Sequence, residues 1–204
     1  MSDLAAQFGD LDVYLFDQWL RGRIAPGMRL LDAGCGGGRN LVHLMREGFE
    51  VCGADSSPAA IEAVRALAAR LAPSLPDNAF RAEPVEQMSF PDAHADVVIA
   101  SAVLHFARDD AHFGAMLAEC WRVLRPGGLF FARLASTAGL DGQLVALGHN
   151  RFVVPDGSTR YLVDEARLSA SAAALGGELA DPLKTTLVHG MRSMTTWVLR
   201  KARA

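Results

Sequence analysis

The sequence predicts an α/β fold, a doubly wound and mostly parallel seven-stranded sheet with helices on both faces and a carboxyl-terminal antiparallel hairpin. Short apolar runs alternate with segments of helical periodicity between residues 28 and 134, which is typical of parallel strands joined by right-handed crossovers. Val97 to Ala100 form an uninterrupted apolar run, as expected for a strand buried on both faces. Only His189 and Gly190 separate the last two apolar runs, and this spacing favours a hairpin.

The boundaries of the expected helices are marked by capping residues and stops. Ser57 followed by Pro58 predicts a helix start, since serine caps a helix N-terminus and proline fits its first turn. Gly48 and the pair Gly127-Gly128 are typical helix stops. In chain order, helices are expected over residues 10–22, 40–47, 58–71, 109–124 and 164–175, and strands over residues 28–33, 50–54, 79–82, 96–101, 129–134, 183–188 and 191–199.

Composition excludes several classes of protein. The 204 residues are 50% hydrophobic and carry a net charge of −3, so no basic arm for nucleic acid is present. The cysteines Cys35, Cys52 and Cys120 form no CxxC or Cys/His pair, which argues against a disulfide framework and a zinc site. The chain has no apolar stretch long enough for a membrane helix, and its start lacks the pattern of a signal peptide. We therefore expect a cytoplasmic protein with no metal and no membrane or nucleic-acid partner.

The domain organisation is expected to be simple. At about 150 residues per domain, the length favours one domain over residues 1–204. Within it, residues 1–27 are expected to form an N-terminal helical lid. Residues 136–160 are glycine-rich and have no clear period, so we interpret them as an insertion on the substrate side.

A glycine-rich loop follows the first expected strand. It reads Asp-x-Gly-x-Gly-x-Gly and begins at Asp32, ahead of an expected helix whose free N–H groups could meet a ligand. A dinucleotide fingerprint fails here, because the third glycine would fall on Arg39 or on Leu41. On its own, the loop is also compatible with a tight turn that binds nothing.

An acidic residue, Asp55, ends the second expected strand. A carboxylate at that sheet edge can accept both hydrogen bonds of a ribose diol. Alternatively, Asp55 could cap the following helix, a role that Ser56 or Ser57 could also fill. The loop and the acid together predict a nucleoside site.

With these motifs, the sequence resembles the class I S-adenosylmethionine-dependent methyltransferases over roughly residues 10–135. The segment LLDAGCGGGRN at residues 30–40 matches the first motif of the family, and ADSS at residues 54–57 matches its ribose-binding acid. Residues 89–98 match the segment that leads into the fourth strand, and residues 122–128 match the turn before the fifth. Within the family, the chain is similar to the small-molecule branches of type 11 and of tellurite resistance.

The resemblance implies S-adenosylmethionine as the cofactor and assigns its contacts by position. Gly34, Cys35 and Gly36 would lie against the methionine part, with Asp32 near its amino group and Ser101 on the sulfonium side. Asp55 would meet the ribose hydroxyls. Ser56 would lie beside the adenine, and Val85 and Glu86 at the adenine edge.

The adenine edge departs from the family pattern. An acid followed by alanine is usual where this chain has Pro84-Val85. The adenine amino group would then meet Glu86, with Glu83 or no carboxylate at all as the alternatives.

The acceptor side of the site is less defined by sequence. Methyl transfer needs a general base only if the acceptor has a proton to lose. His105, four residues after Ser101, is the best-placed candidate for this catalytic role, and a structural histidine is the alternative. Arg133, Tyr161, His189 and Arg192 could line an acceptor pocket; the last two could bind an anion or lie on an exposed turn.

The leading functional hypothesis is methyl transfer to a small-molecule acceptor by in-line displacement. Residues 101–106 lack the Asn/Asp-Pro-Pro-aromatic motif of enzymes that methylate nucleobase amino groups. A catalytically silent S-adenosylmethionine-binding sensor or partner protein is the alternative. A nicotinamide-dependent oxidoreductase is disfavoured by the failed fingerprint. We expect a monomer or homodimer.

Overall fold

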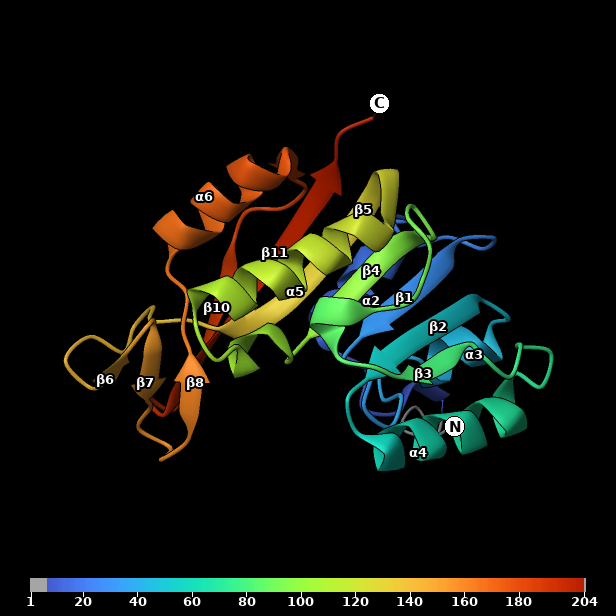
Figure 1. Cartoon of the computed structure of the whole chain (residues 1–204), viewed down its shortest axis with the longest axis horizontal. Helices are drawn as coiled ribbons and strands as arrows, with labels where there is room; N and C mark the ends of the chain where they lie inside the picture. Colours follow the sequence, from blue (N-terminus) through green and yellow to red (C-terminus); the bar gives the residue numbers. More distant parts are fainter. Residues whose placement is uncertain (1–6, 204) are drawn as a thin grey trace.

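A mixed sheet runs through the molecule and confirms the predicted fold class. The computed structural model describes residues 7–203, so the parts of the expected domain and lid that fall on residues 1–6 and 204 lie outside the described residues. The strand order is β10-β11-β5-β4-β1-β2-β3, with β9 paired to β11 (Figure 1). The strands are β1 Arg29–Ala33, β2 Glu50–Asp55, β3 Phe80–Ala82, β4 Ala95–Ser101, β5 Leu124–Ala135, β9 Gly177–Leu179, β10 Lys184–Val188 and β11 Arg192–Lys201.

One strand, β11, runs opposite to the other strands of this sheet among the described residues. The pairs β1–β2, β1–β4, β2–β3 and β4–β5 are parallel, whereas β11 runs antiparallel to β5, β9 and β10. The β10–β11 hairpin therefore extends the parallel sheet at the β5 edge. Because β1, β2, β4 and β5 are parallel, their carboxyl ends lie at the same edge of the sheet, where such folds bind ligands.

Helices cover the sheet as the capping signals predict. Ser57 caps α4 through a hydrogen bond from the Ala60 N–H, and Gly176 ends α6 in the left-handed conformation. Figure 1 shows α5 lying across the front of β4 and β5. The helices are α2 Val13–Leu20, α3 Val42–Arg46, α4 Pro58–Leu71, α5 Asp110–Val123 and α6 Glu165–Leu175, with short 3₁₀ turns η1 Val85–Gln87 and η2 Leu104–Phe106. No helix in residues 7–203 is long and apolar enough to cross a bilayer.

The core is centred on β4 and β5. Val97, Val98 and Ile99 are fully buried, as expected for a strand covered on both faces. Trp197 and Phe130 pack edge to face beside them, with ring centroids 5.8 Å apart. Burial of this apolar surface fixes the strand register and so the positions of the loops at the strand ends.

The segment 136–160 contains strands that its sequence pattern does not indicate. It contributes most of a second, antiparallel sheet of order β6-β7-β8, built from β6 Val145–Gly148, β7 Arg151–Val153 and β8 Thr159–Tyr161. Every residue of β6 is exposed, so no alternation of apolar and polar residues marks it. Figure 1 shows this small sheet at the end of the molecule remote from α4.

Two other details differ from the sequence prediction. The segment Arg125 to Gly128 was expected to be a turn, but it belongs to β5, with Gly127 in the left-handed region at φ 75°. The three-residue strand β9 was not predicted, because an exposed run of three residues carries no period.

Candidate functional site

The glycine loop lies between β1 and α3 and is anchored to the end of β2. The N–H groups of Gly34 and Cys35 both donate to the carbonyl of Ala54, at 2.8 and 3.0 Å. Gly34 has a φ of 78°, and a Cβ there would lie 2.4 Å from the Val103 side chain. Only glycine meets both conditions, so the residue type at position 34 follows from backbone geometry and close packing.

The Asp55 carboxylate is held by two backbone N–H groups. Its Oδ2 accepts from Gly36 and its Oδ1 from Ser57, each at 2.9 Å. Because the Ser57 hydroxyl caps α4, the capping role left open by the sequence belongs to Ser57. A carboxylate has about four lone-pair sites, so Asp55 keeps acceptor capacity for further hydrogen bonds.

Asp55 opens onto a cavity of about 450 Å³, which we call the Asp55 pocket. Five of the predicted cofactor residues line it, together with residues from η2 and α5 that the sequence reasoning missed. No local signal marks those others, because the start of α5 reaches the pocket only through its packing against η1. The predicted residues are Gly34, Asp55, Ser56, Val85 and Glu86, and the missed ones include Phe106, Arg108, His112 and Met116.

Glu86 faces an imidazole and a guanidinium in this pocket. Its Oε1 lies 3.0 Å from Nε2 of His112 and 3.7 Å from a guanidinium nitrogen of Arg108. Partial burial works to raise the pKa of Glu86, but its own backbone N–H, His112 and Arg108 outweigh burial and hold that pKa below its usual value. Glu86 is therefore an ionised acceptor at neutral pH.

Four other predicted cofactor residues lie outside the Asp55 pocket lining. Cys35 is buried, and its side chain packs against Gly53 of β2. Gly36 meets the site through the Asp55 hydrogen bond rather than through the cavity wall. The remaining two, Asp32 and Ser101, are buried polar groups beside the loop.

Asp32 is a buried carboxyl group; no hydrogen bond of good geometry reaches it from the described residues, although Asn40 lies close enough to lower its pKa. Burial raises its pKa to about 7, against the opposing charge of Arg39. A buried carboxyl group without a well-formed hydrogen bond is costly to a fold and is more typical of functional sites than of cores.

Ser101 belongs to a polar network that includes Asp12, the N-cap of α2. The Ser101 hydroxyl donates to Oδ2 of Asp12 at 3.1 Å and accepts from Arg39 at 3.1 Å. Arg133 also donates to Oδ2 of Asp12, at 3.3 Å. The N-terminal segment is thus tied to the ends of β4 and β5 through a fully buried carboxylate. Sequence reasoning missed Asp12, since only its capping position before α2 is visible locally.

A second cavity, of about 440 Å³, lies on the other side of Ala102; we call it the Arg133 pocket. His105 and Arg192 line it together with Arg133. Ala102 lines both cavities, so the two pockets meet at this residue. It has a left-handed φ of 63°, a strained conformation for alanine that the surrounding packing must hold.

His105 is buried, and its protonation state follows from its neighbours. Its Nδ1 accepts a hydrogen bond from the backbone N–H of Ala135 at 3.3 Å. Neutral His105 must therefore carry its proton on Nε2. Burial, helped by the charge of Arg160, lowers the pKa of His105 to about 4. At neutral pH the ring is an uncharged hydrogen-bond donor through Nε2.

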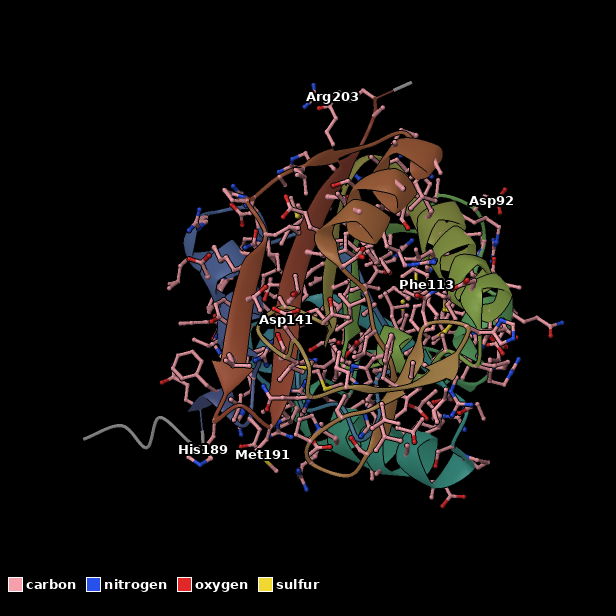
Figure 2. All side chains as sticks on the ribbon, turned by 90° about the vertical axis from the view of Figure 1, so that its left-hand side faces the viewer. Asp92, Phe113, Asp141, His189, Met191 and Arg203 are labelled. Carbon is pink, nitrogen blue, oxygen red and sulfur yellow. The ribbon has the colours of Figure 1, made fainter. Side chains whose placement is uncertain are left out.

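The other sequence candidates for the acceptor side divide into two groups. Arg133 and Arg192 line the Arg133 pocket. Tyr161 is buried and donates to Asp110 at 2.7 Å, outside the pocket lining. His189 is exposed at the tip of the β10–β11 hairpin, and Figure 2 shows it pointing away from the sheet.

Comparison with known families decides the family of this chain. A family model described as "Methyltransferase domain" matches residues 31–132. The chain belongs to the class I S-adenosylmethionine-dependent methyltransferases. The match agrees with the type 11 branch, whereas similarity to the tellurite-resistance branch stays a prediction.

Named methyltransferases are similar to this chain in sequence and fold. A ubiquinone biosynthesis O-methyltransferase of Bradyrhizobium sp. is 31% identical over 152 residues, 68% of this chain and 57% of that protein. A malonyl-[acyl-carrier protein] O-methyltransferase of Serratia marcescens is 32% identical over 163 residues, 78% of this chain and 58% of the relative. The chain thus spans less than two thirds of either relative. A solved structure of a methyltransferase from Methanosarcina mazei has a TM-score of 0.75 at 19% identity, with 91% of this chain and 98% of that chain covered.

The Asp55 pocket of this methyltransferase fits the adenosyl part of the cofactor. Asp55 presents free acceptor sites for a ribose diol, and Glu86 supplies a second carboxylate in the same cavity. Apolar side chains, among them Val103 and Met116, provide surface for a planar base. The buried Asp32 carboxyl group beside the loop, which has no well-formed hydrogen bond, matches a cationic amino group.

Proposed function

We propose that this protein transfers a methyl group from S-adenosylmethionine to an oxygen of a small-molecule acceptor by in-line displacement. The contact of the Asp55 pocket with the Arg133 pocket at Ala102 carries the proposal, because two substrates could meet there. Both curated relatives described above carry the name O-methyltransferase, which supports oxygen as the acceptor atom.

Most of the catalysis in this proposal comes from alignment. The cofactor, when bound, supplies a methyl group on a positively charged sulfur. Asp55 and Glu86 hold its nucleoside, and Gly34 of the glycine loop lines the same cavity, packed against Val103. An acceptor in the Arg133 pocket would approach the methyl group from the far side of Ala102.

The electron and proton balance limits the role of His105. The acceptor oxygen gives a lone pair to the methyl carbon, the carbon–sulfur bond breaks, and its electron pair stays on sulfur. A hydroxyl acceptor must also lose a proton, whereas an ionised oxygen loses none. Since Nδ1 of His105 is occupied and Nε2 carries a proton, we propose that His105 orients the acceptor by donating a hydrogen bond.

Calorimetric titration with S-adenosylmethionine, S-adenosylhomocysteine and NADH tests the cofactor half of the proposal. Micromolar binding of the two adenosyl compounds and none of NADH is expected. Absence of adenosyl binding would overturn the proposal, and Pro84-Val85 would be the first place to look for the cause.

Mass spectrometry of methyl transfer to a panel of oxygen, nitrogen and sulfur acceptors tests the other half. Turnover of an oxygen acceptor supports the proposal. Cofactor binding without turnover of any panel member favours a silent sensor or partner protein instead. The cytoplasmic location, the monomeric or homodimeric state and the lack of nucleic-acid partners stay predictions.

A further inference from the structure

The Arg133 pocket carries an excess of positive charge. Four guanidinium groups line it, from Arg39, Arg133, Arg160 and Arg192, against one carboxylate, that of Asp156. Within residues 7–203, neither Arg160 nor Arg192 has a carboxylate within 4.0 Å. Unpaired guanidinium groups converging on a cavity attract anions.

Arg133 is held in place by two contacts. Its Nη1 donates to Asp12, and its guanidinium lies 5.4 Å from the centre of the Tyr14 ring. Its Nε is buried and has no partner among the described residues. The Arg133 side chain is still 24% exposed, so a guanidinium fixed on one side can present its remaining terminal donors to a planar or tetrahedral oxyanion.

The rest of the pocket adds neutral donors and an apolar wall. The hydroxyls of Ser136 and Ser193 lie 3.1 Å apart on buried residues, and Thr195 donates to Ser136 at 2.8 Å. These hydroxyls belong to a buried polar cluster rather than to an exposed surface. The wall between them and the small sheet is apolar and includes Leu140, Val154, Leu162 and Met194.

We propose that the methyl acceptor is an anion with an apolar body, whose carboxylate or phosphate is bound by Arg133 and Arg192. This inference rests on the proposed function and adds the substrate class to it. The apolar body lies along the Leu140 and Val154 wall, and the oxyanion fixes the distance of the reacting atom from Ala102. An acceptor with two ionised oxygens would need no base, which agrees with the proton on Nε2 of His105.

Matched probe molecules test the anion requirement. Binding of 3-phenylpropanoate, its uncharged amide and phenyl phosphate is measured by calorimetry on the protein saturated with S-adenosylhomocysteine. One of the two anions is expected to bind at least about tenfold more tightly than the amide, and to weaken with added salt. The anion that binds more tightly shows whether the pocket is suited to a carboxylate or to a phosphate. Equal binding of all three, or binding of none, would overturn the proposal.

Arginine variants assign the binding groups. Arg192→Gln and Arg133→Gln should each weaken the anion by about tenfold or more and leave the amide unchanged, since only charge-assisted hydrogen bonds are lost. The exposed Arg192 is the safer position, because Arg133 also pairs with the buried Asp12. Arg70→Gln, on the exposed face of α4, is the matched control and should change nothing. Equal weakening of anion and amide by Arg192→Gln would contradict the assignment.

The two proposals fail separately. If S-adenosylhomocysteine does not bind but the anion does, the cofactor assignment is wrong and the anion pocket stands. If S-adenosylhomocysteine binds and every probe fails, the anion pocket is wrong and the methyltransferase proposal stands.

Discussion

Oδ2 of Asp55 accepts the backbone N–H of Gly36 at 2.9 Å, so the end of β2 holds the glycine loop in place. The other carboxylate oxygen accepts the Ser57 N–H and ties the same side chain to the start of α4. The Asp55 carboxylate thereby fixes the glycine loop to the end of β2 and to the start of α4, although α3 separates the loop from both in the chain. The Asp55 carboxylate, which we propose for the ribose contact, is oriented by these backbone groups before any ligand arrives, which reduces the entropy lost on binding.

Replacing Asp55 by alanine should weaken S-adenosylmethionine binding by about 1.5–3 kcal/mol, as expected for lost charge-assisted hydrogen bonds. Calorimetry measures the affinity, and thermal unfolding measures the separate cost of losing the two backbone contacts. Glu62→Gln, on the exposed side of α4, serves as the control and should leave affinity unchanged. An unchanged affinity in Asp55→Ala would remove Asp55 from the ribose site.

Replacing Glu86 by glutamine should reduce discrimination between adenine and hypoxanthine. The wild-type carboxylate can accept the adenine amino group, whereas the inosine analogue of S-adenosylhomocysteine presents an oxygen there and would face an ionised acid. We expect the wild type to prefer the adenosine compound by about 1–2 kcal/mol and the variant to lose most of that preference. Glu83→Gln is the matched control; if it rather than Glu86→Gln removes the preference, Glu83 is the adenine acid.

Much of this fold is readable from the sequence because burial imposes a pattern on it. β4 is covered on both faces, and its apolar run marks it without ambiguity. Asp55 could be placed because a residue at the end of a parallel strand must lie at the binding edge. In contrast, β6 is exposed throughout and leaves no periodic trace.

The acceptor side depends on contacts that are distant in sequence. The Arg133 pocket joins the ends of β4 and β5 to β8 and β11, and no local motif records that convergence. His105 could be named from its place after β4, but its tautomer depends on the Ala135 N–H, 30 residues away. The role of Asp12 likewise depends on Ser101 and Arg133, far along the chain.

Replacing Asp12 by alanine should destabilise the protein by about 2–4 kcal/mol. The change removes the N-cap of α2 and leaves Arg133 without its buried counter-ion. Urea unfolding measures the loss. In limited proteolysis, the first cleavage of the variant should fall near residues 13–20. The neighbouring exposed Asp10→Ala should be near neutral in both measurements. A similar loss of stability in the two variants would argue against the buried network as the anchor of this segment.

Replacing Asp32 by asparagine should stabilise the ligand-free protein at alkaline pH. The folded pKa of Asp32 is raised to about 7 by burial, above the unfolded value of 3.8. Between these values the folded state holds a proton that the unfolded chain has released, so stability falls as pH rises through the window. From pH 4 to pH 8 the variant should gain about 3–4 kcal/mol relative to the wild type.

Urea unfolding at several pH values measures that gain for Asp32→Asn. A constant difference between the two proteins would mean that Asp32 does not titrate in this range. The same variant tests the cofactor assignment, because a carboxylate that meets the cofactor's amino group should cost affinity when neutralised. A variant that gains stability and keeps full affinity would place Asp32 outside the cofactor site.

Replacing His105 by asparagine should remove part of the fall in the free energy of unfolding that the wild type shows as the pH drops from 6.5 to 4. Burial lowers the folded pKa of His105 to about 4, below the unfolded value of 6.5, so the unfolded chain binds a proton first as pH falls. Wild-type stability from this group is therefore complete above pH 6.5 and declines between pH 6.5 and pH 4, by up to about 3 kcal/mol. Asparagine Oδ1 can still accept the Ala135 N–H but does not titrate.

Urea unfolding at pH 7, 5 and 4 follows the difference between the His105→Asn variant and the wild type. Asp32 contributes a slope of opposite sign to both proteins, so it cancels in this comparison. His189→Asn, at the exposed hairpin tip, is the control for loss of a histidine and should follow the wild type. If His105→Asn keeps the full acid-side decline, another group causes that decline and the pKa of His105 is not lowered in the folded wild type. Burial would then not keep the His105 ring neutral in mild acid, and the proposed role of Nε2–H as the orienting donor would lose that support.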